Sequence, residues 1–245
     1  MKLIFIRHGE PDYSIDSLTE KGDREAKLLA ERISKLDIKD IYVSPLGRAQ
    51  RTASYTLEKM GREAVCYDWL REFEGKMYKP NNPNTLRICW DWLPKDWMGD
   101  ERFFDKDKWL TPECFDNTNV RSENQRVIDG IDKVIEEHGY VKEGNLYKVI
   151  NPNNDTLVFF CHFGVTCVML GRILNISPMI LWHNFCALPT SVTQVVTEER
   201  TEGIANFRML QFGDISHLYA GGEAPSFMAR FCECFMNENE NHGHD

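Results

Sequence analysis

The sequence predicts a three-layer α/β/α fold, in which helices cover both faces of a mainly parallel sheet. Two observations carry this prediction. Short apolar runs alternate with amphipathic helical patterns over residues 3–67, and a second strongly apolar run returns at 157–161. Strands that alternate with helices at this spacing are typical of parallel sheets whose crossover helices lie on both faces.

The expected elements follow from periodicity and end signals. Leu-Ile-Phe-Ile at 3–6 is a buried strand, and apolar residues at helical spacing predict a helix over 20–36 with Thr19 as its N-cap. Ser44-Pro45 is a typical helix start, and the helix should run to about residue 60. The other expected elements are strands at 40–43, 64–67 and 157–161, helices at 120–138 and 165–174, and a strand pair at 191–197 and 203–211.

Residues 74–118 break this alternation. The segment holds several prolines, many charges and four of the six tryptophans, so it is too aromatic to be disordered. We interpret it as an inserted α-rich subdomain with short helices at the carboxyl edge of the sheet, near the functional site. The chain is then a single domain over 1–235, followed by a flexible polar tail at 236–245.

Composition limits the partners. The formal net charge of −9 argues against nucleic acid and against an anionic membrane, because both attract basic surfaces. No apolar run is long enough for a membrane helix, and Lys2 is followed by only four apolar residues, so we expect a cytoplasmic protein. The eight cysteines are then expected to be reduced thiols. Oligomeric state is left open.

Unusual polar groups follow three of the expected strands. Arg7 and His8 come after the first strand, Ser44 to Arg51 after the second, and His162 after the strand at 157–161. Such groups are costly in a core without partners, but ligands bind outside the carboxyl ends of parallel strands. We therefore expect these side chains to meet in one pocket.

These residues resemble a known family. Arg7-His8-Gly9 after an N-terminal apolar strand resembles the Arg-His-Gly branch of the histidine phosphatase superfamily, which includes the cofactor-dependent phosphoglycerate mutases. Four further features fit in order, and the resemblance covers about 3–75 and 155–215. They are Leu18-Thr19-x-x-Gly22, Ser44-Pro45-Leu46-x-Arg48-Ala49, Leu70-Arg71-Glu72, and an apolar strand ending in His162 with Gly164.

The resemblance implies a phosphoglycerate mutase-like fold and a role for each matching residue. His8 would be the nucleophile that forms a phosphohistidine. Arg7 and Arg48 would bind the phosphoryl oxygens, His162 would complete the phosphate-binding pocket, and Glu72 would be the general acid. The residue types suit this chemistry, since phosphoryl transfer needs mainly positioning and positive charge, which arginine supplies without a metal or other cofactor.

Plainer interpretations compete at individual positions. A lone histidine such as His8 is more often a hydrogen-bonded core residue, and Arg48 could be a solvated helix residue, as we assume for Arg51. Either Glu72 or Glu74 could be the acid, although the family pattern favours Glu72. His138, His183 and His217 are expected not to be catalytic.

Three hypotheses remain for function. The leading one is a metal-independent phosphomonoester hydrolase that acts on a small phosphorylated substrate through phosphorylated His8. The second is a phosphoglycerate mutase, and the third is a non-catalytic protein that binds a phosphorylated ligand. Three departures from the family pattern weaken the mutase assignment. The segment between Gly9 and Leu18 is short, Phe163 stands where a glycine is more usual, and the Gly-x-x-Glu-Gly-like run after Glu72 is reduced to Phe73-Glu74-Gly75.

Overall fold

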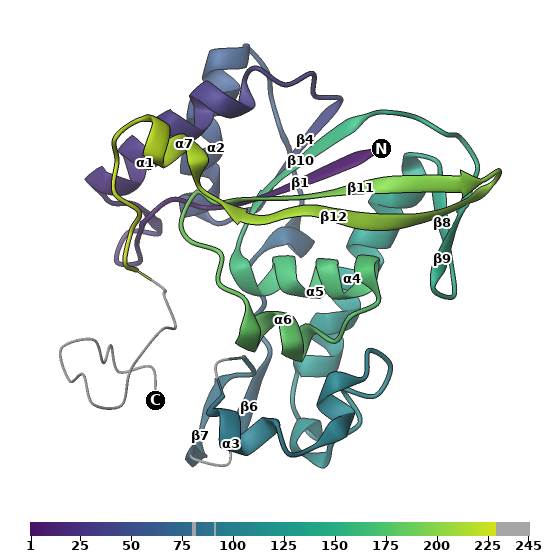
Figure 1. The fold of residues 1–245 in the computed structure, drawn as a ribbon. Helices are drawn as coiled ribbons and strands as arrows, with labels where there is room; N and C mark the ends of the chain where they lie inside the picture. Colours follow the sequence, from purple (N-terminus) through teal and green to yellow (C-terminus); the bar gives the residue numbers. More distant parts are fainter. Residues whose placement is uncertain (80–81, 91, 229–245) are drawn as a thin grey trace.

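The computed structural model describes residues 1–79, 82–90 and 92–228. Its centre is an eight-stranded sheet (Figure 1). Across the sheet, the strands are β5 (Val65–Cys66), β4 (Asp40–Val43), β10 (Thr156–Cys161), β1 (Lys2–Arg7), β11 (Val192–Thr201), β12 (Ile204–Asp214), β9 (Leu146–Val149) and β8 (Tyr140–Glu143). The sheet is mixed. The four strands from β5 to β1 are parallel, and every pair from β1 to β8 is antiparallel.

Helices cover both faces of this sheet (Figure 1). On one face lie α1 (Glu20–Ile33), α2 (Gly47–Met60) and α7 (Ser216–Ala220), and on the other lie α4 (Val120–Glu137), α5 (Phe163–Leu174) and α6 (Pro178–Asn184). The predicted three-layer α/β/α fold is therefore confirmed.

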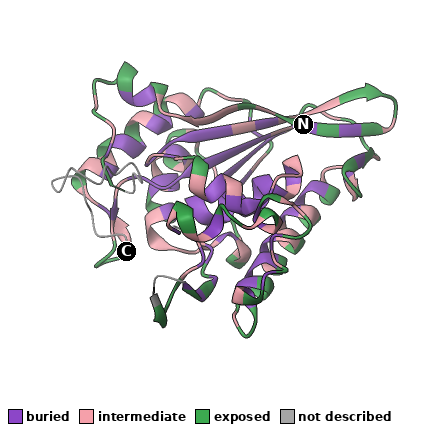
Figure 2. Ribbon diagram, turned by 60° about the horizontal axis from the view of Figure 1, so that its bottom comes forward, coloured by how far each residue is buried: buried purple, intermediate pink, exposed green. Residues whose placement is uncertain are grey.

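Alternate side chains of β1 enter two separate cores. Leu3 and Phe5 pack with α4 and α5, whereas Ile4 and Ile6 pack with α1 and α2. Successive side chains of a strand point to opposite faces, so a strand buried on both faces must be apolar throughout. Figure 2 shows the central strands buried and the far ends of β11 and β12 exposed.

Several boundaries differ from those expected. Thr19 caps α1 as predicted, because its hydroxyl accepts the N–H of Gly22 at 3.0 Å. The prediction that Ser44-Pro45 begins the next helix is wrong: α2 begins at Gly47, and its N-cap, Leu46, has no side-chain capping bond. The Ser44 hydroxyl is used at the site described below. Helix α5 begins at Phe163, two residues earlier than expected.

The β8–β9 hairpin was not expected from the sequence. Each of its strands has four residues, and Gly144 in the connecting turn has a φ of +59°. Strands this short carry little period-two signal, and β8 follows α4 directly, so periodicity assigned the region to no element.

The insertion contains a β-hairpin as well as short helices. Its elements are β6 (Lys76–Lys79), β7 (Asn82–Ile88), α3 (Pro94–Trp97) and two 3-10 turns, Glu101–Phe104 and Glu113–Phe115. Trp92, Trp97 and Trp109 are buried in the same apolar cluster as Phe5 and Phe159 of the sheet, so the insertion shares the core of the α4–α5 face. The tail expected at 236–245 lies outside the described residues.

Candidate active site

Arg7 and His8 lie where β1 ends. Arg7 is the last residue of the strand, opposite Cys161 of β10, and the N–H of His8 donates to the carbonyl of Cys161 at 3.1 Å. The His8 side chain is 3% exposed, and its Nδ1 lies 2.8 Å from the carbonyl oxygen of Gly9. A carbonyl can only accept, so Nδ1 carries the proton and the lone pair of the neutral ring is on Nε2.

The turn after His8 is fixed to α2. A side chain at Gly9 would place its Cβ 2.8 Å from the carbonyl oxygen of Gly22, so this close approach of two chain segments requires glycine. The N–H of Gly9 donates to Thr52 Oγ1 at 2.9 Å, and the Thr52 hydroxyl donates to the carbonyl of Arg48 at 2.7 Å. Thr52 therefore ties the turn at His8 to the turn of α2 that carries Arg48.

The two arginines predicted for the site are both largely buried. Arg7 donates to the carbonyl of Ala187 at 2.5 Å, and Arg48 donates to Asp16 at 2.6 Å. The Nε atoms of both guanidinium groups are buried and have no hydrogen-bond partner. The Arg48 side chain is 12% exposed, whereas Arg51 is 46% exposed and pairs with Asp23. The structure therefore separates Arg48 from the solvated Arg51.

His162 approaches His8 from the end of β10. The two ring centroids lie 5.1 Å apart, and His162 is fully buried. Its Nε2 lies 2.7 Å from the hydroxyl oxygen of Ser44, and that oxygen also accepts the N–H of Leu46. In the tautomer that carries its proton on Nδ1, His162 accepts the Ser44 hydroxyl at Nε2. The Nδ1 atom has no partner among the described residues.

Both imidazoles are neutral. The pKa of His8 lies well below its usual range. Burial lowers it most, and the positive charge of Arg7 lowers it further. Burial likewise lowers the pKa of His162, with His8, Arg48 and Arg7 as further causes. Four side chains that follow three strands therefore influence one another electrostatically.

Glu72, and not Glu74, lies beside this cluster. One carboxylate oxygen of Glu72 accepts the N–H groups of Phe73 at 2.7 Å and Val165 at 2.9 Å, and the other accepts that of Gly164 at 3.3 Å. The carboxyl group therefore lies at the N-terminus of α5, directly after His162. Burial raises the pKa of Glu72, against the lowering effect of these bonds and of Arg7. Glu74 is exposed.

The sequence does not indicate the contacts that three residues around the cluster make. Ser44 and Thr52 are common polar residues whose partners lie far away in the chain, and Thr190 donates its N–H to the carbonyl of His8 at 3.1 Å. The Nε2 of His217 lies 3.2 Å from the Thr190 hydroxyl. His217 is therefore linked to His8 only through Thr190. His138 and His183 have structural partners instead, Asp40 and the N–H of Trp92.

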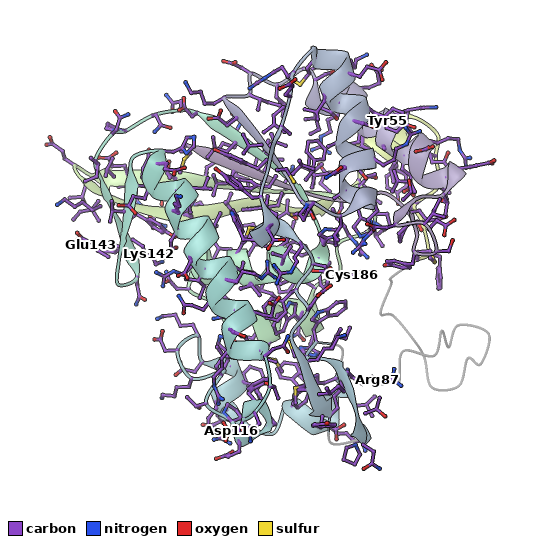
Figure 3. The ribbon with its side chains drawn as sticks, turned by 180° about the vertical axis from the view of Figure 1, so that it is seen from behind. Tyr55, Arg87, Asp116, Lys142, Glu143 and Cys186 are labelled. Carbon is purple, nitrogen blue, oxygen red and sulfur yellow. The ribbon has the colours of Figure 1, made fainter. Side chains whose placement is uncertain are left out.

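The insertion reaches the same region. Figure 3 shows Arg87 of β7 and Cys186 on one side of the molecule, with Lys142 and Glu143 of β8 on the opposite side. Cys186 precedes Ala187, whose carbonyl binds Arg7. The hairpin of the insertion therefore projects on the side of the molecule where the Arg7 loop lies.

The described residues give two further facts. Over 1–79, 82–90 and 92–228, no three His, Cys, Asp or Glu side chains are grouped so that they could hold a metal ion. No helix in this part of the chain has the length and apolar character needed to cross a membrane.

The fold and site define an α/β protein whose strand ends gather two arginines and two neutral imidazoles, an arrangement suited to a phosphoryl group. The chain belongs to the histidine phosphatase superfamily, branch 1, whose family model matches residues 3–208. This result confirms the resemblance found in the sequence.

Curated relatives include both mutases and phosphatases. A probable phosphoglycerate mutase of Cronobacter sakazakii is 32% identical over 95 residues, which cover 35% of this chain and 44% of that protein. Phosphoserine phosphatase 1 of Hydrogenobacter thermophilus is 33% identical over 87 residues, covering 32% of this chain and 41% of that protein. The chain thus spans less than half the length of these relatives.

Solved structures show the same fold. A phosphoserine phosphatase of Entamoeba histolytica has a TM-score of 0.58 at 22% identity, covering 89% of this chain and 98% of that chain. A mycobacterial glucosyl-3-phosphoglycerate phosphatase has a TM-score of 0.58 at 17% identity, covering 86% and 98%. These structures support the predicted phosphoglycerate mutase-like architecture.

Proposed function

We propose that this protein is a metal-independent phosphomonoester hydrolase that transfers the phosphoryl group of a small substrate to His8 and then to water. The observation that carries the proposal is the environment of His8. Its proton is held on Nδ1 by the Gly9 carbonyl, its pKa is lowered, and Arg7 and Arg48 lie nearby. A neutral imidazole with a free lone pair next to two fixed cations is a competent nucleophile for phosphorus.

The surrounding groups take defined roles in this reaction. Arg7 and Arg48 bind the phosphoryl oxygens, and His162 donates from Nδ1 to a third oxygen as charge develops in the transition state. The Nε2 atom of His8 attacks phosphorus while the bond to the leaving oxygen breaks. Protonated Glu72 gives its proton to that oxygen, and the resulting carboxylate then takes a proton from the water that attacks phosphohistidine.

The mutase and binding-protein hypotheses are tested by the same experiment. Several curated relatives are named phosphoglycerate mutases, so phosphoglycerate with a bisphosphorylated primer belongs among the substrates tried. The decisive measurement is rapid acid-free quenching after mixing with a radiolabelled aryl phosphate in the presence of EDTA. We expect a labelled, acid-labile and base-stable adduct that maps to His8.

The His8→Asn variant should form no adduct and should lose about a thousandfold or more in turnover. Asn keeps a polar side chain of similar size, so a melting temperature near that of the wild type would separate loss of the nucleophile from loss of the fold. Binding of phosphate without turnover or adduct would replace the hydrolase proposal with the binding-protein hypothesis. Turnover that is unaffected by His8→Asn would refute the proposed nucleophile.

A further inference from the structure

A cavity of about 610 Å³ lies between α4, α5, the insertion and the turn of the β8–β9 hairpin. Cavities of this size are typical of small-molecule sites. Gly144 lines the cavity and follows Glu143, which Figure 3 shows on the side of the molecule opposite Cys186. The lining includes none of the five residues placed in the active site, so the cavity is separate from the pocket around His8.

Asn124 of α4 is a buried polar group in the wall of this cavity. It is 7% exposed, and its amide forms no hydrogen bond with the part of the chain that the structure describes. The next residue, Gln125, is exposed and has a partner, Asp129, at 2.7 Å. Burying an amide without a partner costs free energy, because the group gives up hydrogen bonds to water. The Asn124 amide can recover them from a ligand, with two N–H donors and one carbonyl acceptor.

Arg172 of α5 presents a second polar group to the same cavity. Its Nε and Nη2 atoms donate to Asp132 at 3.0 and 2.6 Å, and its Nη1 has no hydrogen-bond partner among the described residues. A guanidinium group stays charged at physiological pH, so Nη1 can donate to an anion without releasing Asp132. Lys106 of the insertion also lines the cavity and pairs with Asp107 at 2.6 Å.

Lys142 adds a positive charge directly behind this wall. Its Nζ donates to the carbonyl of Arg172 and to Asn175 Oδ1, both at 3.1 Å, and it pairs with no carboxylate in the described segments. Burial is the main cause that lowers the pKa of Lys142 to about 8, and the charges of Arg172 and Lys106 contribute. The three cations have two carboxylate partners between them. One positive charge is therefore uncompensated here, although the whole chain has a formal charge of −9.

The two polar groups lie about two helical turns apart. Asp132, which binds Arg172, follows Asn124 by eight residues on α4, or about 12 Å along the helix axis. Ile128 lies halfway between Asn124 and Asp132 and lines the cavity. Val168, which precedes Arg172 by one turn of α5, also lines it. A ligand that meets both polar groups must therefore be elongated and apolar in its middle.

We propose that this cavity binds a small, elongated organic carboxylate, whose negative charge lies at Arg172 and whose other end hydrogen-bonds to Asn124. A monoanion matches the single uncompensated positive charge, whereas a phosphate dianion would also face the carboxylates of Asp107 and Asp132. The inference goes beyond the proposed hydrolase function and does not depend on it, because the cavity is separate from His8.

The test compares three probes by calorimetry. They are 6-acetamidohexanoate, its neutral counterpart 6-acetamidohexanamide, and hexanoate, which lacks the distal amide. We expect 6-acetamidohexanoate to bind with a dissociation constant of about 1 mM or below. It should bind at least about fivefold more tightly than either of the other two. Equal affinities for 6-acetamidohexanoate and the neutral amide, or no binding of any probe, would overturn the inference.

Variants assign the binding to the two polar groups. Asn124→Leu should weaken the binding of 6-acetamidohexanoate about fivefold and leave that of hexanoate unchanged. Arg172→Gln keeps an amide that can donate to Asp132, and should weaken both carboxylates about fivefold or more. The second variant also covers the case in which Asn124→Leu does not fold. Gln125→Ala is the matched control, because Gln125 is the exposed neighbour of Asn124. Wild-type affinity in both Asn124→Leu and Arg172→Gln would refute this site.

Competition separates this site from the active site. Saturating inorganic phosphate should leave the binding of 6-acetamidohexanoate unchanged, and so should His8→Asn. Loss of binding in the presence of phosphate would place the carboxylate among Arg7 and Arg48 and would overturn the inference. Because the probes carry no phosphorus, these results are the same whether or not the protein hydrolyses phosphomonoesters.

Discussion

Thr190 donates its backbone N–H to the carbonyl oxygen of His8 across 3.1 Å, from a backbone conformation with a φ of +58°. A β-branched residue in the left-handed region is an outlier that costs about 1–3 kcal/mol and persists only where its surroundings hold it. The Thr190 hydroxyl donates to the carbonyl of Pro189 at 2.7 Å, and the Nε2 of His217 lies 3.2 Å from that hydroxyl. The loop that binds Arg7 through Ala187 thus also holds His8.

His217 is expected to position this loop. Because the Thr190 hydroxyl already donates to Pro189, His217 Nε2 is the donor in their contact, and His217→Ala removes it. We expect kcat to fall about fivefold, as for the net loss of one neutral hydrogen bond, with KM nearly unchanged. His217→Gln offers an amide N–H and should restore most of kcat. A lower melting temperature with unchanged kcat would show that His217 only stabilises α7.

Ser44 is expected to set the tautomer of His162. In the proposed reaction Ser44 donates to Nε2, so Ser44→Ala leaves the ring free to carry its proton there and to turn its bare Nδ1 toward the substrate. We expect a loss of about tenfold in kcat/KM and weaker inhibition by vanadate, since one donor to the phosphoryl group is lost. Nitrogen NMR shifts of the His162 ring report the tautomer directly.

Ser54→Ala is the matched control for this change. Ser54 is on the same helix as Arg48, but its hydroxyl is exposed and donates to the carbonyl of Arg51. It should leave kcat/KM unchanged. Wild-type vanadate inhibition in Ser44→Ala would show that His162 keeps its tautomer without Ser44.

Glu72 should produce the falling limb of the pH–rate profile. Its pKa is raised by burial, and the proposed first step needs the protonated carboxyl, so the rate should fall as pH rises through that pKa. Glu72→Gln keeps an oxygen that can accept the N–H groups of Phe73 and Val165. We expect this variant to lose about a hundredfold or more on alkyl phosphates and much less on p-nitrophenyl phosphate, whose leaving group needs no proton.

The measurement is kcat against pH for both substrates, with Glu74→Gln as the control. Glu74 is exposed, and its substitution should leave the profile intact. A falling limb that persists in Glu72→Gln would assign it to another group, and one that disappears in Glu74→Gln would reverse the choice between the two glutamates.

The sequence predicts most of this site because its main residues follow buried strands. Arg7, His8 and His162 each stand directly after an apolar run, and parallel strands bring their carboxyl ends together. Glu72 and Arg48 were assigned from a family pattern and not from periodicity. The structure places Glu72 against the helix that His162 begins, which is a contact between distant segments that local sequence does not encode.

What the sequence does not predict depends on long-range partners. Ser44 has the features of a helix cap, yet its hydroxyl binds an imidazole 118 residues away and α2 begins without a side-chain cap. Trp90 is one of several tryptophans in the insertion, and only its packing above Gly164 distinguishes it from the buried Trp97. The β6–β7 hairpin was missed because β6 has only four residues and β7 begins with Asn-Pro-Asn, which is typical of a turn.

Gly164 should be intolerant of a side chain because of Glu72, and not because of its helix. It lies in the first turn of α5, where alanine favours the helix by up to about 1 kcal/mol. A Cβ there would lie 2.8 Å from Glu72 Oε1. We expect Gly164→Ala to keep or raise the melting temperature and to lower kcat about tenfold or more, because the acid is displaced.

Gly99→Ala is the control for Gly164→Ala, since a Cβ at Gly99 meets no atom within 4 Å. It should leave kcat unchanged. Wild-type kcat in Gly164→Ala would mean that Glu72 moves without consequence, and would count against its role as the acid.

Glu25 should make the stability of the fold depend on pH. It is fully buried in α1, and one of its carboxylate oxygens accepts the N–H of Glu10 at 2.9 Å, next to the turn at Gly9, while the other has no partner. Burial, with a smaller contribution from Glu10, raises its pKa to about 7 from the usual 4.5. The folded state therefore keeps a proton that the unfolded state releases between these values.

The direction in which stability changes with pH follows from this difference in bound protons. The contribution of Glu25 is most favourable below about pH 4.5 and is lost as pH rises through about 7, a change of about 3 kcal/mol in the free energy of unfolding. Glu25→Gln should gain stability over the wild type at pH 8 and little at pH 5, as measured by urea unfolding at both. Glu31→Gln, on the same helix but exposed, should show no such gain. An equal effect of Glu25→Gln at both pH values would contradict the raised pKa. It would mean that the Glu25 carboxyl is ionised at pH 5 as well as at pH 8 in the folded protein.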